Sequence, residues 1–287
     1  MNIHPTIERW STVCEAISLR ALFTMCRLLG YLGSSIQLDR ILIKPEHSLI
    51  TQSYKPQEMT SGFLNADGFG MGWYNLERDP LPYSYRNTMP IWNDVNIADM
   101  GRYIESSCYL AYIRSATSSS SIALNNCQPF SYQNILFIHN GFIDNFRETL
   151  YRPIRNHLSD VAYKNIEGTT DSEHIFAMIV DQLESDRSIG LYEALKNTLV
   201  KLAEMANENN LELSANIILS DGKELTACRY ANRKETPSLY YIKDNSEYSN
   251  AVIIASEPLF EGDWISCPKG SLIGVGEDLE ISINSIV

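Results

Sequence analysis

The residue with the clearest potential for covalent chemistry is Cys26, in the segment FTMCRLLGYLG that spans residues 23–33. A thiol attacks only after it has lost its proton, so it needs a base within hydrogen-bonding distance. The histidines of the chain form no recognisable Cys-His pattern with it. A free α-amino group, with an unperturbed pKa of about 7.7 to 8.0, can accept the proton, whereas an amide nitrogen inside a chain cannot. If Met25 is the true start and is removed, Cys26 carries both nucleophile and base.

Asn140 and Gly141 end the segment FIHNG. An isolated Asn-Gly pair most often forms a tight turn, and here it follows a buried, strand-like run. In the alternative interpretation, the Asn140 side-chain amide and the Gly141 backbone N–H are two donors for a developing oxyanion. Glycine would permit a close approach of the substrate.

Arg114 and Asp171 are the other two polar residues that could bind a substrate. Arg114 lies in the otherwise neutral segment YLAYIRSAT and needs either a structural carboxylate or a ligand carboxylate as its partner. Asp171, in TTDSEH, is by default a helix N-cap, although it could also bind an ammonium group. A cation and an anion match the two charges of an α-amino acid. With Cys26 facing the side-chain amide of a bound glutamyl group, the set indicates cleavage of a γ-glutamyl amide.

The elements that must position these residues change type along the chain. Period-2 alternation and turn signals predict strands at both ends, and helical periodicity with Thr169, Thr170 and Asp171 as candidate caps predicts helices between them. The expected strands cover residues 26–33, 47–54, 68–76, 108–117, 134–141, 213–230 (as a hairpin), 238–243, 251–259 and 270–276. The expected helices cover residues 169–185 and 190–210, and residues 115–126 form a candidate flap. Strands, then helices, then strands without a Pro/Ser-rich linker favour one α+β domain.

The composition limits the kinds of binding partner and indicates the cellular compartment. The chain has 287 residues, 44% of them apolar, and a formal net charge of −12, which disfavours nucleic acid and anionic membranes as partners. No apolar run reaches the roughly 18 residues that span a bilayer, and charged residues interrupt any signal-peptide pattern in residues 1–25. The six cysteines form no CxxC pair, so we expect no disulfide framework, metal site or cofactor, and a reducing cytoplasm. The expected partner is a small-molecule substrate, and the sequence identifies no protein partner.

The motifs resemble those of the class II glutamine amidotransferases, which are N-terminal nucleophile (Ntn) hydrolases. They occur in family order between Met25 and about Pro258: MCRLLGYLG, YIRSAT, NCQPF, FIHNG and TTDSE. The resemblance implies an αββα four-layer sandwich, with Cys26 as nucleophile and base and with Asn140 and Gly141 as the oxyanion hole. It also implies that Arg114 and Asp171 bind the glutamyl group, with Thr117 a weaker assignment.

Within the class, LITQSYKP, GFLNADGFGMGWY, MPIWND and IRSAT resemble the γ-glutamyl hydrolases of ergothioneine biosynthesis. The implied reaction is hydrolysis of a γ-glutamyl hercynylcysteine sulfoxide to release glutamate. Tyr54, Trp73 and Trp92 could bind the trimethylammonium of such a substrate, although core packing is their default interpretation. One departure from the family is Tyr112, which stands where many amidotransferases have histidine.

The second departure is at the start of the chain, because residues 1–25 have no counterpart in the family pattern. We therefore expect a type-2 amidotransferase domain over residues 26–287, and an extension over residues 1–25 that is absent from the active protein or removed from it. Two alternatives stay open. One is the same mechanism in another role, either a glutaminase that supplies ammonia to a partner or a γ-glutamyl peptidase of glutathione breakdown. The other is a non-catalytic subunit that retains residues 1–25.

Overall fold

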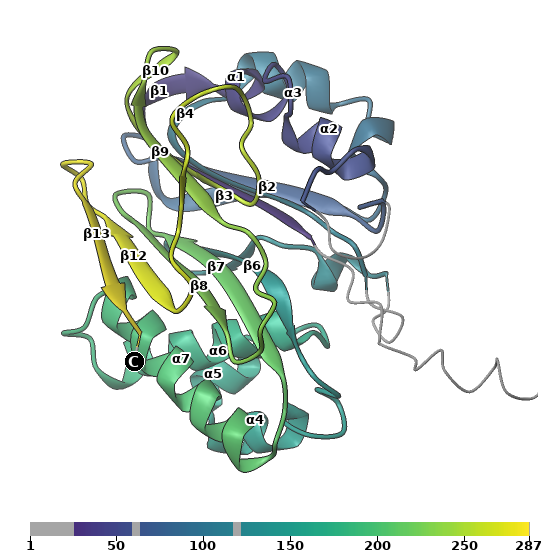
Figure 1. Ribbon diagram of the computed structural model, residues 1–287, viewed down its shortest axis with the longest axis vertical. Coiled ribbons are helices and arrows are strands. Elements are labelled where there is room, and N and C mark those ends of the chain that lie inside the picture. The colour runs from purple at the N-terminus through teal and green to yellow at the C-terminus, as the bar shows by residue number, and fades with distance from the viewer. Residues whose placement is uncertain (1–25, 59–63, 117–121, 287) are drawn as a thin grey trace, which may run out of the picture.

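Two antiparallel β-sheets face each other and are enclosed by helices on both sides (Figure 1). The computed structural model describes residues 26–58, 64–116 and 122–286. Helices α1 to α3 cover the outer face of the first sheet, and helices α4 to α7 cover the outer face of the second (Figure 1). The predicted α+β architecture, an αββα four-layer sandwich, is confirmed.

The first sheet has seven strands and the second has six among the described residues. The order in the first sheet is β11 (Ile265–Ser266), β9 (Tyr240–Asn245), β10 (Tyr248–Ala255), β1 (Arg27–Gln37), β4 (Glu105–Ile113), β2 (Phe69–Asn75) and β3 (Asp79–Asn87). The order in the second is β13 (Ile281–Ser285), β12 (Ser271–Val275), β8 (Leu225–Ala231), β7 (Leu213–Ser220), β6 (Ile135–Ile143) and β5 (Phe130–Tyr132). Strands β1 and β6, which carry the candidate nucleophile and the candidate oxyanion donors, thus belong to different sheets.

The helices differ in length between the two outer layers. Those on the first sheet are short: α1 (Leu38–Leu42), α2 (Leu49–Tyr54) and α3 (Ile97–Tyr103). Those on the second are α4 (Tyr151–His157), α5 (Asp160–Lys164), α6 (Asp171–Ser185) and α7 (Leu191–Glu208). Two 3₁₀ turns, η1 (Ile91–Asn93) and η2 (Leu124–Asn126), lie in connections. The long helices α6 and α7 are those that the periodicity predicts. No helix in the described part of the chain is both long enough and apolar enough to cross a membrane.

Apolar side chains from both sheets fill the space between them. Because successive residues of a strand face opposite sides of the sheet, only every second residue points into this central layer. Leu28 and Leu110 enter it from the first sheet, and Leu136 and Ile138 enter it from the second. Cys26 belongs to the same buried cluster. The candidate nucleophile therefore lies at the end of the inter-sheet core and not on the outer surface of a sheet.

Two local predictions are wrong. Residues 47–54 were expected as a strand because of their β-branched and aromatic residues, but they contain helix α2. The Ser48 side chain accepts a hydrogen bond from the Thr51 backbone N–H at 3.3 Å, which caps that helix. The Asn140–Gly141 pair is not a turn, because β6 continues through it to Ile143. Of the candidate flap, residues 117–121 lie outside the described residues, and η2 forms its end.

Candidate functional site

Cys26 immediately precedes β1, and its thiol is surrounded by polar groups from the end of β4. The Tyr112 hydroxyl donates to Sγ at 2.9 Å, and the Ser115 backbone N–H donates to it at 3.3 Å. As a thiol, Sγ can also donate to the Ser115 carbonyl at 3.5 Å. The residue is only 9% exposed. The sulfur therefore has partners for both its protonated and its ionised form.

Burial controls the protonation of this thiol. It raises the pKa of the Cys26 thiol above its usual value, although the Tyr112 and Ser115 hydrogen bonds and the Arg114 charge act in the opposite direction. A thiol with a raised pKa is mostly protonated near neutral pH and needs a base to react. The hydrogen-bond partners of Sγ among the described residues are Tyr112 and Ser115 and include no histidine, which agrees with the absence of a Cys-His pattern in the sequence. The geometry thus supplies no side-chain base for this thiol among the described residues.

A buried ion-pair cluster supports the backbone of the nucleophile from the opposite face of β1. Arg27 Nη1 donates to the Cys26 carbonyl at 3.0 Å, and Arg27 Nη2 lies 2.7 Å from Glu257 Oε1. His47 Nε2 lies 2.6 Å from Glu257 Oε2. Glu257 also accepts from the backbone N–H groups of Gln57 and Glu58, at 2.8 and 3.1 Å. This cluster connects the position of Cys26 to the 57–58 loop.

The charge of Glu257 is well compensated. Burial raises the pKa of this carboxyl, but the His47 hydrogen bond, the Arg27 charge and the two backbone donors outweigh it and lower the pKa to about 2. Sequence reasoning missed the whole cluster. The only local signal was an arginine directly after Cys26 in an otherwise apolar strand, because Glu257 and His47 are distant in sequence.

Arg114 lies directly after β4, beside the nucleophile. In the β1–β4 register Arg27 pairs with Ile113, which places Arg114 next to Cys26. Arg114 is 3% exposed, and its Nη1 donates to the Asp67 carbonyl at 3.4 Å. The Asp67 carboxylate accepts from the Ala116 backbone N–H at 2.7 Å and so holds the chain that leaves β4. Thr117 lies outside the described residues.

Asn140 faces the central layer from the second sheet. It is two residues from Ile138 on β6 and therefore shares its face, and it is 2% exposed. Its Nδ2 is buried and has no hydrogen-bond partner among the described residues. Because buried donors are nearly always paired, this amide is available to donate to a bound ligand.

Gly141 presents its backbone N–H at an open edge of β6. The Gln128 side chain bonds both the N–H and the C=O of His139, on the side of β6 that faces β5. Gly141 is two residues further, so its N–H points to the same side, and β5 pairs only as far as Phe137. A Cβ at this position would overlap the Ser214 carbonyl and the His139 ring, so only glycine fits here.

Asp171 is the first residue of α6 and lies at the end of β6. The cap is Thr170, whose hydroxyl accepts from the Glu173 N–H, so the default interpretation of Asp171 as N-cap is wrong. Asp171 Oδ2 accepts from the Ile143 backbone N–H at 2.9 Å, and Oδ1 accepts from the Ser172 N–H at 2.7 Å. These bonds hold its carboxylate beside Ile143, the last residue of β6, which is two residues after Gly141.

The packing between the sheets places Cys26 and Arg114, of the first sheet, at the same end of the sandwich as Asn140 and Gly141, of the second. Leu136 of β6 lies against Gly72, which pairs with Leu110 of β4. Two residues further along β2, Gly70 pairs with Tyr112 and lies against Gln128, which bonds His139. The end of β6 that carries Asn140 therefore lies over the end of β4 that is followed by Arg114 and lies beside Cys26.

The candidate aromatic residues divide into two kinds. Trp73 packs against the core of the first sheet and against Tyr83, with ring centroids 4.8 Å apart, so its default interpretation is confirmed. Tyr54 and Trp92 are 51% and 39% exposed, and their rings meet edge to face at 6.1 Å. The default interpretation of Tyr54 and Trp92 as core residues is therefore wrong.

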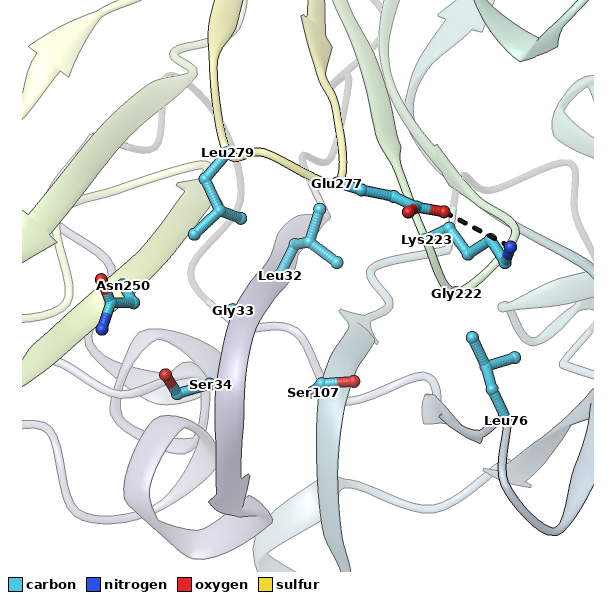
Figure 2. A pocket seen from close by; sticks show the side chains of 10 residues that line it. All are labelled: Leu32, Gly33, Ser34, Leu76, Ser107, Gly222, Lys223, Asn250, Glu277 and Leu279. Atoms are coloured by element: carbon cyan, nitrogen blue, oxygen red, sulfur yellow. Dashed lines mark ion pairs between the residues drawn. The ribbon is translucent and has the colours of Figure 1, made fainter.

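Figure 2 shows the residues that line a cavity of about 420 Å³. Leu32 and Gly33 of β1, Leu279 and the Lys223–Glu277 ion pair are among its lining residues. None of the sequence-predicted site residues lines it. In the described part of the chain, no three His, Cys, Asp or Glu side chains are grouped to hold a metal ion.

Known proteins resemble this chain in sequence over most of its length. Residues 25–252 match the family model described as class II glutamine amidotransferases. The chain is 30% identical to a probable glutamine amidotransferase, DUG3, of Saccharomyces cerevisiae, over 88% of this chain and 82% of that one. It is also 30% identical to the γ-glutamyl-hercynylcysteine sulfoxide hydrolase of Mycobacterium tuberculosis (strain H37Rv), over 88% and 93% of the two chains.

Solved structures show the same fold. A class II glutamine aminotransferase domain protein from Silicibacter pomeroyi superposes with a TM-score of 0.66 at 24% identity, over 91% of this chain and 99% of that chain. The allosteric regulatory enzyme of purine biosynthesis superposes with a TM-score of 0.63 at 15% identity, over 91% of this chain and 49% of that one. The chain therefore belongs to the class II glutamine amidotransferases and is an amidohydrolase of that family.

Proposed function

We propose that this protein hydrolyses a γ-glutamyl amide bond, with Cys26 as nucleophile and its α-amine as base. The observation that carries the proposal is the buried Nδ2 of Asn140, which has no partner among the described residues. The packing between the sheets puts Asn140 at the same end of the sandwich as the Cys26 thiol. A preorganised donor without a partner is suited to charge that develops only in the transition state. The Gly141 N–H at the open edge of β6 supplies the second donor.

The reaction then follows from these groups. The α-amine accepts the thiol proton, Sγ attacks the γ-carbonyl carbon, and the carbonyl electrons move to the oxygen, which Asn140 and Gly141 stabilise. When the tetrahedral intermediate collapses, the leaving amine takes the proton from the ammonium of Cys26 and a thioester remains. Water, deprotonated by the same amine, hydrolyses the thioester and releases glutamate.

Arg114 and Asp171 are proposed to bind the α-carboxylate and the α-ammonium of the glutamyl group. Arg114 supports this role through its place next to Cys26, and Asp171 through its position at the end of β6. Thr117 is proposed as a further contact.

The mechanism requires that residue 26 begins the active protein. An amide nitrogen cannot take the thiol proton, so we extend the proposal to the absence or removal of residues 1–25. A match to the family model that begins at residue 25 supports this. We also propose a cytoplasmic location, which suits a thiol enzyme whose described cysteines are all free.

The finer proposal for the substrate is γ-glutamyl hercynylcysteine sulfoxide, and the role is in ergothioneine biosynthesis. The mycobacterial relatives that carry this substrate in their names support it. The exposed Tyr54–Trp92 pair gives independent support, because open aromatic faces bind a trimethylammonium group. Short links join this pair to the site: the Asn65 N–H donates to Ser53, next to Tyr54, and Ser115 Oγ donates to the Leu64 carbonyl.

The second candidate is another use of the same chemistry. The yeast relative is as similar in identity and is named a probable glutamine amidotransferase. This name favours glutamine hydrolysis for a partner, and γ-glutamyl peptide cleavage in glutathione breakdown is the other alternative that the sequence leaves open. A non-catalytic role follows only if residues 1–25 stay attached.

A mass-spectrometric assay of glutamate release distinguishes these candidates. The purified protein, with Cys26→Ala as the control for contaminating activity, is given the hercynylcysteine sulfoxide conjugate, glutamine and glutathione. We expect release from the first at least tenfold faster than from the others. Trp92→Ala should raise KM for that conjugate much more than for glutamine. Comparable rates on glutamine or glutathione, or an equal effect of Trp92→Ala on all substrates, would reject the finer proposal.

A further inference from the structure

The Cys26 sulfur is contacted by one side-chain hydroxyl in the described part of the chain. The Tyr112 O–H donates to it at 2.9 Å, a short distance for a hydrogen bond to sulfur. Ser115 supplies a backbone N–H to the same atom. A thiolate accepts both bonds, whereas a thiol must also direct its own proton elsewhere.

The position of this hydroxyl is fixed by the sheet. Tyr112 lies on β4 between β1 and β2, opposite Leu28 on one side and Gly70 on the other. It is 4% exposed. A Cβ on Gly70 would overlap the Gln128 carbonyl, so the strand that flanks Tyr112 is itself packed against the second sheet. The ring therefore has little freedom to leave the sulfur.

We propose that Tyr112 is a further catalytic residue, whose hydroxyl stabilises the Cys26 thiolate when the α-amine takes the thiol proton. This rests on the proposed function, because it assumes that Cys26 is the nucleophile. The proton of the step moves only from Sγ to the α-amine, and the Tyr112 proton stays on its oxygen. As the new S–C bond forms, the sulfur loses its charge and the hydrogen bond weakens.

A tyrosine suits this role because it does not titrate in the working range. Burial, with the nearby Cys26, raises the pKa of Tyr112 well above its usual value, so the hydroxyl stays protonated and able to donate near neutral pH. A histidine, which the family motif has at this place, has an ordinary pKa of about 6.5 and would change its charge there. With tyrosine at position 112, the pH profile of Cys26 near neutrality therefore carries no second ionisation from this position.

The test is the pH dependence of Cys26 alkylation by iodoacetamide, followed on the Cys26 peptide by mass spectrometry. Wild-type and Tyr112→Phe chains with the same first residue are compared. Loss of a hydrogen bond to a charged group should raise the midpoint of the profile by about one to two pH units. We also expect kcat to fall about 10- to 100-fold, with KM within about threefold.

Tyr109→Phe is the matched control. Tyr109 is also buried on β4, but its hydroxyl donates to the Ile36 carbonyl on the other face of the sheet. The Tyr109→Phe protein should be less stable to unfolding, but the pH midpoint of Cys26 alkylation should not change. A midpoint unchanged in folded Tyr112→Phe, or shifted equally in Tyr109→Phe, would overturn the proposal.

Tyr112→His gives a second, independent outcome. An imidazole beside the sulfur should add an ionisation below about pH 7 to the alkylation profile. A profile identical to that of the wild type would show that the sulfur does not sense position 112. Because alkylation needs no substrate, these results stand even if γ-glutamyl hydrolysis is not observed.

Discussion

The two ends of the sandwich differ in what they offer a small molecule. One end has a cavity of about 420 Å³, and the ion pair that lines it, Lys223 and Glu277, is drawn in Figure 2. The two side chains are 59% and 68% exposed and lie 3.4 Å apart. The Cys26 end has a buried thiol, a buried Arg27–Glu257 pair at 2.7 Å and an orphaned Asn140 amide. The proposed site is therefore distinguished by buried polar groups, whereas the charged pair that lines the cavity is exposed.

The physical reason is the dielectric environment. An exposed ion pair is screened by water and contributes about 0 to 1 kcal/mol, whereas the same charges when buried interact strongly and are costly to leave unpaired. Such groups persist in a fold only when each has a partner or a function. The difference between the ends predicts that substitutions at the Cys26 end have large effects and that equivalent ones at the cavity end have small effects.

Removing the orphaned donor should have the largest effect. Asn140→Ala is expected to lower kcat by about 10²- to 10³-fold, because one oxyanion donor is lost, and to change KM by less than about threefold. Stability to urea should be unchanged or higher, since an unpaired buried donor is removed. Steady-state kinetics and urea unfolding measure the two quantities.

Lys223→Met is the matched substitution at the cavity end. It removes an exposed charge beside the hollow and should leave kcat within about twofold and stability within about 0.5 kcal/mol. A loss of activity comparable to that of Asn140→Ala would place the chemistry at the cavity. An Asn140→Ala protein with wild-type kcat would remove Asn140 from the oxyanion hole.

Breaking the buried pair should have a smaller effect on catalysis but a clear one on stability. Glu257→Gln leaves the Arg27 charge without its carboxylate, and we expect a loss of about 3 kcal/mol in the free energy of unfolding at pH 7. The activity should fall about tenfold, because Arg27 holds the Cys26 carbonyl. Lys44→Met, which removes a lysine 60% exposed in its side chain, serves as a control and should change neither quantity.

The stability difference should depend on pH in one direction. The pKa of Glu257 is about 2 in the folded chain, below its ordinary value of about 4.3. Its contribution is therefore complete above about pH 4.3 and is lost as the pH falls towards 2. Urea unfolding of wild type and Glu257→Gln from pH 7 to pH 3 measures this. A difference that stays constant over that range would mean that the Glu257 charge does not stabilise the fold.

Much of the fold was predictable from local patterns. Strand patterns predicted β1, β2, β4, β6 and the β7–β8 hairpin, and helical periodicity predicted α6 and α7. The short helices α1, α3, α4 and α5 were not predicted. Helix α2 was missed because its β-branched residues favour a strand, while the decisive Ser48 cap is a single hydrogen bond. The Asn140–Gly141 pair has the local sequence of a turn. It stays in a strand because it pairs with β7, and this long-range interaction is not visible in the local sequence.

The candidate residues could be identified from the sequence, but their surroundings could not. Cys26, Asn140 and Arg114 stand in motifs, and the structure places all three at one end of the sandwich. The sequence could flag Tyr112 only as an unusual residue, because its contact with Cys26 depends on the β1–β4 register. The Arg27–Glu257–His47 cluster had no local signal, since its members meet only in the folded chain.

The most direct test of the central claim compares two starting points of the chain. A protein expressed from Met25, with an intact mass that shows Cys26 as its first residue, is assayed beside a protein whose mass shows that it begins at Met1. Glutamate release from the preferred γ-glutamyl substrate is measured for both. A free α-amine as the base predicts turnover by the first and less than about 1% of that rate for the second. Equal rates would contradict the claim that the Cys26 amine takes the proton.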